Sequence, residues 1–181
     1  AVIETIGLPQ NARILDYCAG GGGKALALAA LSQQTVDVWD SDAGRMIDIA
    51  KRADRAGATI IRLPEAPTDA DSNSLYDLVL CDVPCSGSGA WRRSPQGKWL
   101  LTAERLSQLR DIQTEILDQA APLVAQDGLL VYTTCSFLKE ENIDIIQLFI
   151  TNNTDWISDF SRQFLPSDGG DGFFVAHLKK V

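Results

Sequence analysis

Histidine and methionine are scarce in this sequence, with one of each among 181 residues. The single histidine, His177, lies near the C-terminus. A zinc site or a Ser-His-Asp hydrolase needs more ligands or bases than one histidine supplies, so we expect neither. Any chemistry must therefore use thiols, carboxylates or a bound cofactor.

Long hydrophobic runs, repeats and low-complexity tracts are also missing. No apolar run approaches the roughly 20 residues of a membrane span, so we expect no membrane segment. We predict one domain over residues 1–181, with a single core. Because residue 1 is alanine rather than methionine, we expect a fragment or a processed product.

Cysteine is limited to four residues, Cys18, Cys81, Cys85 and Cys135. They are too scattered for a disulfide framework or for paired metal ligands, so we expect no metal site. Reduced thiols favour a cytoplasmic location. We interpret Cys81 as a small buried hydrophobe.

Basic residues are fewer than acidic ones, 16 against 24, which gives a formal net charge of -8 at pH 7. This charge argues against nonspecific nucleic-acid binding by the whole surface, since phosphate contacts need Lys and Arg. Residues 86–110 differ, with five basic residues and a single acidic one, Glu104. We predict a basic strip on an acidic body, formed by Arg92, Arg93, Lys98, Arg105 and Arg110.

Short apolar runs rich in β-formers alternate with helical patterns along the chain. This alternation is typical of a Rossmann-like α/β fold, a mostly parallel sheet with helices on both faces. Residues 156–160 and 172–180 are strands without a helix between them, which favours an antiparallel end strand. The predicted strands are 13–18, 35–39, 59–63, 76–82, 128–135, 156–160 and 172–180, and the predicted helices are 24–32, 43–57, 102–125 and 139–153.

The helix predicted over 102–125 has its own boundary signals. Thr102 is a suitable N-cap and Glu104 lies in the first turn. Pro122 should kink or shorten its last turns.

Four glycines, Gly20–Gly23, separate the first strand from the first helix. A Walker loop is excluded because Cys18 and Ala25 stand where it needs Gly and Ser or Thr. The GxGxxG pattern of dinucleotide-binding loops is matched only in a relaxed form. The alternative without a ligand is a flexible turn. Asp16 before the glycines and Asp40 after the second strand are typical of an S-adenosylmethionine site, with Asp42 as the rival acid.

Cys85 follows the fourth strand and Cys135 ends the fifth, so both lie at the carboxyl edge where ligands bind in such folds. A thiolate can add to carbon 6 of a pyrimidine and make carbon 5 nucleophilic enough to take a methyl group. The carboxyl of Asp82 is placed to hydrogen-bond the cytosine edge. A second thiol can assist product release.

The motifs together resemble the RsmB/Nop/Sun family of RNA cytosine-5 methyltransferases. The similarity lies in "LDYCAGGGGKA", "DVPCSGSGAWRRSPQGKW", "TTCSFLKEEN" and "DGFFVAHLKK", which cover most of the chain. The paired PCSGSG and TCS motifs are specific together, whereas the glycine loop alone is not. The resemblance implies a class I methyltransferase sheet in the order 3-2-1-4-5-7-6, with strand seven antiparallel.

The resemblance also implies roles for individual residues. Cys135 is expected to be the nucleophile, Cys85 the releasing thiol and Asp82 the contact to the cytosine ring, with Lys24 near the cofactor or the catalytic acid. Asp40 is expected to bind the ribose, and Arg92, Arg93 and Lys98 are expected near RNA. The full expected cofactor site comprises Asp16, Cys18, Ala19, Gly20, Gly21, Gly22, Gly23, Lys24, Asp40, Asp82 and Pro84.

The sequence departs from the family pattern in three places. Gly20-Gly21 replaces the usual Ala-Pro, which gives a looser turn. The usual acid at the end of the third strand, which contacts the adenine region of the cofactor in the family, has no clear match, and Glu65 or Asp69 is the substitute. The family's N-terminal RNA-binding parts are mostly absent, so we expect weaker RNA binding.

The leading hypothesis is an S-adenosylmethionine-dependent RNA cytosine-5 methyltransferase, acting as a monomer on ribosomal RNA, with transfer RNA as the next substrate. A DNA cytosine-5 enzyme would not need the TCS thiol, and a small-molecule methyltransferase would need neither the thiol pair nor the basic strip. A non-catalytic ribosome-assembly scaffold would predict loss of a thiol or of Asp82, yet all three residues are present. Arg92 and Arg93 remain open to a second interpretation, a solvated charged turn.

Overall fold

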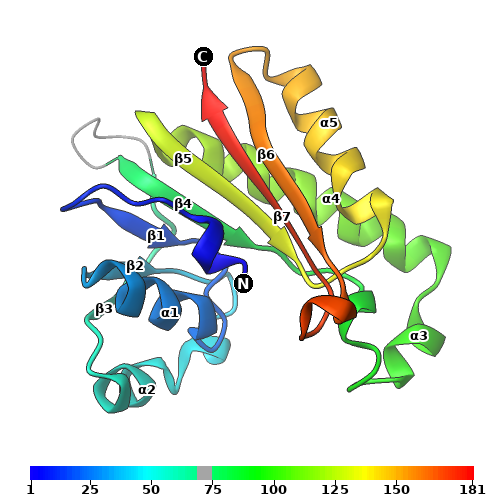
Figure 1. The fold of residues 1–181 in the computed structure, drawn as a ribbon, viewed down its shortest axis with the longest axis horizontal. Helices are drawn as coiled ribbons and strands as arrows, with labels where there is room; N and C mark the ends of the chain where they lie inside the picture. The colour runs from blue at the N-terminus through cyan, green and yellow to red at the C-terminus, as the bar shows by residue number, and fades with distance from the viewer. Residues whose placement is uncertain (69–74) are drawn as a thin grey trace. The chain divides into compact units, whose positions relative to one another are not determined.

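The computed structural model describes residues 1–68 and 75–181. Its strands form a seven-stranded sheet in the order β3-β2-β1-β4-β5-β7-β6 (Figure 1). This order, with β6 and β7 antiparallel, confirms the predicted fold class. The chain divides into two compact units, described separately below: the first unit, Ala1–Asp82 with Ala120–Leu130, and the second unit, Val83–Gln119 with Val131–Val181.

Four short parallel strands form the centre of the first unit. β1 (Ile14–Asp16) pairs with both β2 (Val36–Val38) and β4 (Tyr76–Asp82), and β3 (Ile60–Arg62) pairs with β2. Apolar side chains of both faces of β1 and β4 are buried, as expected for a parallel sheet covered on both sides. This burial explains why these strands appear in the sequence as continuous apolar runs.

Before β4, the described helical segments of the first unit are η1 (Ile3–Thr5), α1 (Gly23–Ser32), η2 (Ala43–Met46) and α2 (Ile49–Ala56). The single helix predicted over 43–57 is wrong, because the segment is broken after Met46. The Asp42 carboxylate accepts a 2.9 Å hydrogen bond from Gly44 N and closes a tight 3-10 turn there. Asp42 is therefore engaged in capping this turn.

The second unit contains an antiparallel strand pair and most of the helices. β6 (Trp156–Phe164) pairs with β7 (Phe173–Lys180), as predicted. α5 (Ile143–Asn152) buries Phe149 against Trp156 with ring centroids 5.7 Å apart. The other helical segments are η4 (Ser88–Ala90), α3 (Gln96–Leu100), α4 (Ala103–Ala120), η6 (Lys139–Glu141) and η7 (Pro166–Asp168).

Two predicted boundaries are corrected around the end of α4. Thr102 Oγ1 accepts a 3.2 Å hydrogen bond from Arg105 N, which confirms the N-cap. The helix stops at Ala120 rather than 125, because Pro122 lies in a 3-10 turn, η5 (Ala121–Leu123). β5 (Val124–Thr134) follows directly and begins before the predicted residue 128. In the described part of the chain, no helix is both long and apolar enough to cross a bilayer.

Candidate active site

The glycine loop of the first unit requires glycine at two of its four positions. Gly20 and Gly22 have φ angles of +50° and +78°, in the left-handed region that side chains rarely adopt. A Cβ atom on Gly22 would lie 2.5 Å from Ile49 Cγ1, whereas one on Gly23 would meet nothing within 4 Å. The loop is therefore a defined turn that leads into α1, which argues against the flexible-turn interpretation.

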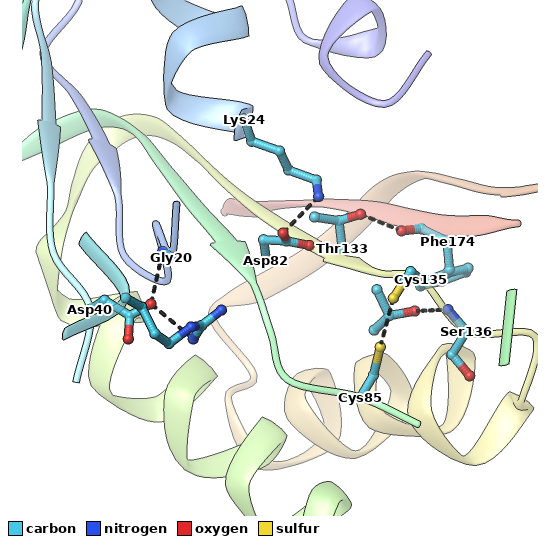
Figure 2. A network of polar contacts seen from close by, with 11 residues as sticks. Gly20, Lys24, Asp40, Asp82, Cys85, Thr133, Cys135, Ser136 and Phe174 are labelled. Carbon is cyan, nitrogen blue, oxygen red and sulfur yellow. Dashed lines mark hydrogen bonds and ion pairs between the residues drawn. The ribbon is translucent and has the colours of Figure 1, made fainter. Parts of the chain in front are cut away.

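Asp40 is the acid that holds this loop (Figure 2). Its buried carboxylate accepts hydrogen bonds from Gly20 N at 2.8 Å and Asp42 N at 2.9 Å, and it pairs with Arg45 at 2.9 Å. A carboxylate has about four lone-pair sites, so about one acceptor site remains for a ligand hydroxyl. The structure thus brings Asp40 to the glycine loop, as the sequence predicted.

Asp16 at the end of β1 is 1% exposed, and neither carboxyl oxygen has a well-formed hydrogen bond among the described residues. Burial, followed by repulsion from Asp82, raises its pKa to about 7, although Lys24 and the backbone amides of Cys18 and Ala25 partly oppose the rise. A buried acid of this kind suits a ligand that carries a positive charge or hydrogen-bond donors.

Lys24 and Asp82 form an ion pair in the first unit, with 2.6 Å between Nζ and Oδ2 (Figure 2). Lys24 lies in the first turn of α1, and Asp82 ends β4. Both side chains are about a quarter exposed, at 21% and 32%, so both remain accessible to a ligand. The two residues expected to share one catalytic region are thus in direct contact.

The remaining predicted cofactor residues differ in their surroundings. Ala19 N donates to Trp39 O at 3.0 Å, and Gly21 O accepts from Arg52 Nη1. Burial and then the nearby Asp16 carboxyl raise the pKa of the Cys18 thiol well above its usual range, which disfavours the thiolate form that reacts. Pro84 lies on the loop of the second unit that carries Cys85, where its carbonyl accepts from Gln113 Nε2 at 2.9 Å.

The two candidates for the adenine contact cannot both be placed. Glu65 is exposed on the segment after β3. Asp69 lies outside the described residues.

The thiols of Cys85 and Cys135 meet in the second unit, with 3.4 Å between the sulfur atoms (Figure 2). Cys85 lies on the loop after β4 and Cys135 on the loop after β5, and neither forms a disulfide. The hydrogen bond to Cys135 and then burial raise the pKa of Cys85 well above its usual range. The raised pKa favours the thiol form of Cys85, and either sulfur can be the donor in this contact.

Sequence reasoning assigned no role to Glu141, which is fully buried beneath the two thiol loops. Its carboxylate accepts hydrogen bonds from the serine after each thiol, Ser86 and Ser136. The only signal for it in the sequence is its place in "TTCSFLKEEN", where nothing separates it from the exposed Glu140.

The predicted basic strip of the second unit is partly neutralised. Asp171, on the turn before β7, pairs with Arg93 and lies 3.7 Å from Arg92. The hydrogen bond from Arg93 lowers the pKa of Asp171. Lys98 is exposed, and its Nζ lies 5.5 Å from the ring centre of Trp99, whose side chain is 81% exposed. The arginines form an ion-paired turn rather than a free cationic patch.

Comparison with known proteins decides the family. Residues 4–179 match the family model described as 16S rRNA methyltransferase RsmB/F. The chain belongs to this family. Its RsmB/F relatives include ribosomal RNA small subunit methyltransferase B of Proteus mirabilis, 37% identical over 98% of this chain and 43% of the relative. A probable methyltransferase B of Bacillus subtilis is 34% identical over 92% of this chain and 43% of its own length.

Solved structures agree with the RsmB/F assignment at the level of the fold. The structure titled PH0851 has a TM-score of 0.89 and 27% identity, covering 99% of this chain and 45% of its own. NSun6 from Pyrococcus horikoshii, solved with SFG, has a TM-score of 0.82 and 21% identity over 99% of this chain and 50% of its own. The chain thus spans less than half the length of the curated relatives it matches.

Proposed function

We propose that this chain is the catalytic domain of an S-adenosylmethionine-dependent enzyme that methylates carbon 5 of cytosine in ribosomal RNA. The observation that carries the proposal is the pair of thiols 3.4 Å apart, in a chain of the RsmB/F family. A scaffold or a small-molecule methyltransferase would have no use for two thiols in contact. The relatives named for ribosomal RNA favour that substrate over transfer RNA.

Cys135 is the nucleophile in the proposed reaction. Its thiolate adds to carbon 6 of the cytosine, which forms a C–S bond and moves electron density to carbon 5. The raised pKa of Cys85 favours its thiol form, and the sulfur atoms lie 3.4 Å apart, so the Cys85 S–H would donate to a Cys135 thiolate and stabilise its negative charge. Cys85 would then assist the nucleophile without competing with it.

Product release completes the proposed cycle. After carbon 5 has taken the methyl group, its proton passes to water, the C–H electron pair re-forms the C5–C6 double bond, and the C–S electron pair leaves with the Cys135 sulfur as a thiolate. Cys85 is in hydrogen-bonding distance of the sulfur that leaves, so it is the group that assists this expulsion. Asp82 would hydrogen-bond the cytosine edge and favour the initial addition.

S-adenosylmethionine would supply an electrophilic methyl group on a sulfonium. The first unit offers the residues to hold it: the glycine loop for close backbone approach, Asp40 for ribose hydroxyls and Asp16 for the cationic end. The fold is shared with a structure solved with SFG, an analogue of this cofactor. Lys24 would hold the Asp82 carboxylate in place through their ion pair.

The test is transfer of labelled methyl groups from S-adenosylmethionine to small-subunit ribosomal RNA, followed by nucleoside mass spectrometry. The proposal predicts 5-methylcytidine with the unaltered chain and none with Cys135→Ala. A methyl group on another atom or base would contradict the proposed chemistry. Absence of product despite measured cofactor binding would favour the scaffold function.

A further inference from the structure

A Cys-Ser dipeptide occurs at both thiols, Cys85-Ser86 and Cys135-Ser136, and both serines bond to one acid. The hydroxyls of Ser86 and Ser136 each donate to the same oxygen of Glu141, Oε2, at 2.5 Å. The serine hydroxyls also lie 3.3 Å from each other. One carboxylate oxygen therefore connects the two loops that hold the thiols.

The other carboxylate oxygen fixes the Cys85 loop a second time. Glu141 Oε1 accepts from Ser86 N at 2.7 Å and from Gln113 Nε2 at 3.2 Å. Gln113 is fully buried and also donates to Pro84 O at 2.9 Å. The backbone is thus held on both sides of Cys85, at Pro84 and at Ser86.

The position of Glu141 itself is determined by its own backbone. Its carbonyl accepts a 2.6 Å hydrogen bond from the buried Tyr132 hydroxyl on β5. The strand that carries Cys135 at its end therefore sets where the Glu141 carboxylate lies. A carboxylate anchored to the Cys135 side and bonded to the Cys85 loop fixes the distance between the sulfurs.

A side chain that served only packing would not be a fully buried carboxylate. Burying an ionised group is costly unless strong hydrogen bonds compensate, and no cation pairs with Glu141 among the described residues. The four compensating donors, from Ser86, Ser136 and Gln113, all belong to or support the thiol loops. A neutral amide of the same length would keep one acceptor oxygen in place of two.

We propose that Glu141 is a positioning residue that holds the Cys85 and Cys135 thiols at the separation used in the reaction. This role rests on the proposed function, since that reaction is what requires the two thiols together. The carboxylate acts through the Ser86 and Ser136 hydroxyls and does not touch the reacting atoms. It sets the distance between the sulfurs, so its loss should separate them without removing either thiol.

The test measures the thiol separation without RNA, as the rate of Cys85–Cys135 disulfide closure by diamide. The two thiols lose two protons and two electrons, and the diazene is reduced to the hydrazine. Peptide mass mapping identifies the Cys85–Cys135 product. We expect Glu141→Ala to slow closure by about tenfold to a hundredfold, because ångström-scale misplacement of reacting groups costs that much.

Two further variants make the comparison decisive. Glu140→Ala removes the exposed neighbouring acid and should close at the wild-type rate. Glu141→Gln keeps the length of the side chain and one carbonyl acceptor, so disulfide closure should be slowed less than in Glu141→Ala, and the melting temperature should lie above that of Glu141→Ala. If Glu141 served only to stabilise the fold, the closure rate would follow the stability of each variant, and Glu141→Gln would not restore part of the rate independently of stability.

The outcomes separate this role from the proposed function. Wild-type closure rates in folded Glu141→Gln and Glu141→Ala would overturn the positioning role even if the chain methylates RNA. If Glu141→Ala does not fold, a wild-type closure rate in Glu141→Gln is by itself enough to overturn the positioning role. Failure of the proposed function would instead show as unmodified RNA with the wild-type chain, whatever the disulfide rates.

Discussion

Asp16 has a strongly raised pKa among the described carboxyl groups of the first unit. Its pKa rises from 3.8 to about 7, first because burial penalises the charged form and then because Asp82 is negative. The folded state therefore binds a proton more tightly than the unfolded chain. The stability that this proton provides is complete below about pH 4 and is lost as the pH rises to about 7.

We predict that Asp16→Asn flattens the pH dependence of unfolding between pH 4 and 7. As the pH rises, the Asp16 carboxyl should lower the unfolding free energy of the wild type by at most about 1.4 kcal/mol per pH unit. The variant lacks this contribution. Urea unfolding at pH 5, 6, 7 and 8 measures the difference. Asp42→Asn, at an exposed capping position, is the matched control and should keep the wild-type slope. Parallel curves for wild type and Asp16→Asn would contradict the assignment.

The sequence predicted the thiol pair but not the groups around it. Cys85 and Cys135 were predictable because each follows a strand, and the strand order places β4 beside β5. Glu141 was not, because its importance comes from burial by loops whose conformation no local pattern encodes. The same holds for Asp171, which is 78 residues from Arg93 in the sequence and pairs with it only after folding.

At the scale of elements, the turn between β1 and α1 determines the candidate cofactor site. Gly22 is the N-cap of α1 and adopts a left-handed conformation beside Ile49 of α2. Gly23 is the first residue of α1 and has open space around it. The two neighbouring glycines therefore have opposite tolerance for a methyl group.

We predict that Gly22→Ala lowers the free energy of unfolding by about 2 kcal/mol or more, from left-handed strain of about 1–2 kcal/mol and the clash with Ile49. Gly23→Ala should leave it unchanged or raise it by about 0.5 kcal/mol, since alanine favours the helix. Chemical denaturation measures both, and isothermal titration with S-adenosylmethionine should show weakened binding for Gly22→Ala alone. Equal effects of the two substitutions would contradict this account of the loop.

Element types were predictable where a pattern was long or strongly punctuated. Thr102 indicated where α4 starts, and Pro122 indicated that it ends early. The final strand pair was predictable because no helical pattern separates its members. The break between η2 and α2 was not predicted, because the apolar spacing continues through it. α3 was also missed, since five residues are too few to show a helical period.

At the scale of the whole molecule, the net charge of -8 limits how the chain can bind RNA. Phosphate contacts are restricted to a few cations, and two of the three predicted ones are paired with Asp171. RNA phosphates would have to replace this carboxylate. Binding should therefore be modest and sensitive to salt.

We predict a slope of about -2 for log Kobs against log salt concentration with single-stranded RNA, from three contacts at about 0.7 each. Arg92→Gln should reduce the steepness by about 0.7. Fluorescence anisotropy with a labelled oligoribonucleotide, at KCl concentrations from about 50 to about 300 mM, measures the slope. Arg55→Gln removes the same charge at an exposed position of α2 and should leave the slope unaltered. A larger effect from Arg55→Gln than from Arg92→Gln would place the RNA elsewhere.

The most direct test of the central claim is a denaturing gel of the Cys85→Ala variant after incubation with S-adenosylmethionine and small-subunit ribosomal RNA. With Cys85 proposed as the releasing thiol and Cys135 as the nucleophile, the account predicts a cofactor-dependent RNA–protein band that disappears when Cys135 is also replaced. A band that persists without Cys135, or one that requires Cys85, would contradict the assigned thiol roles.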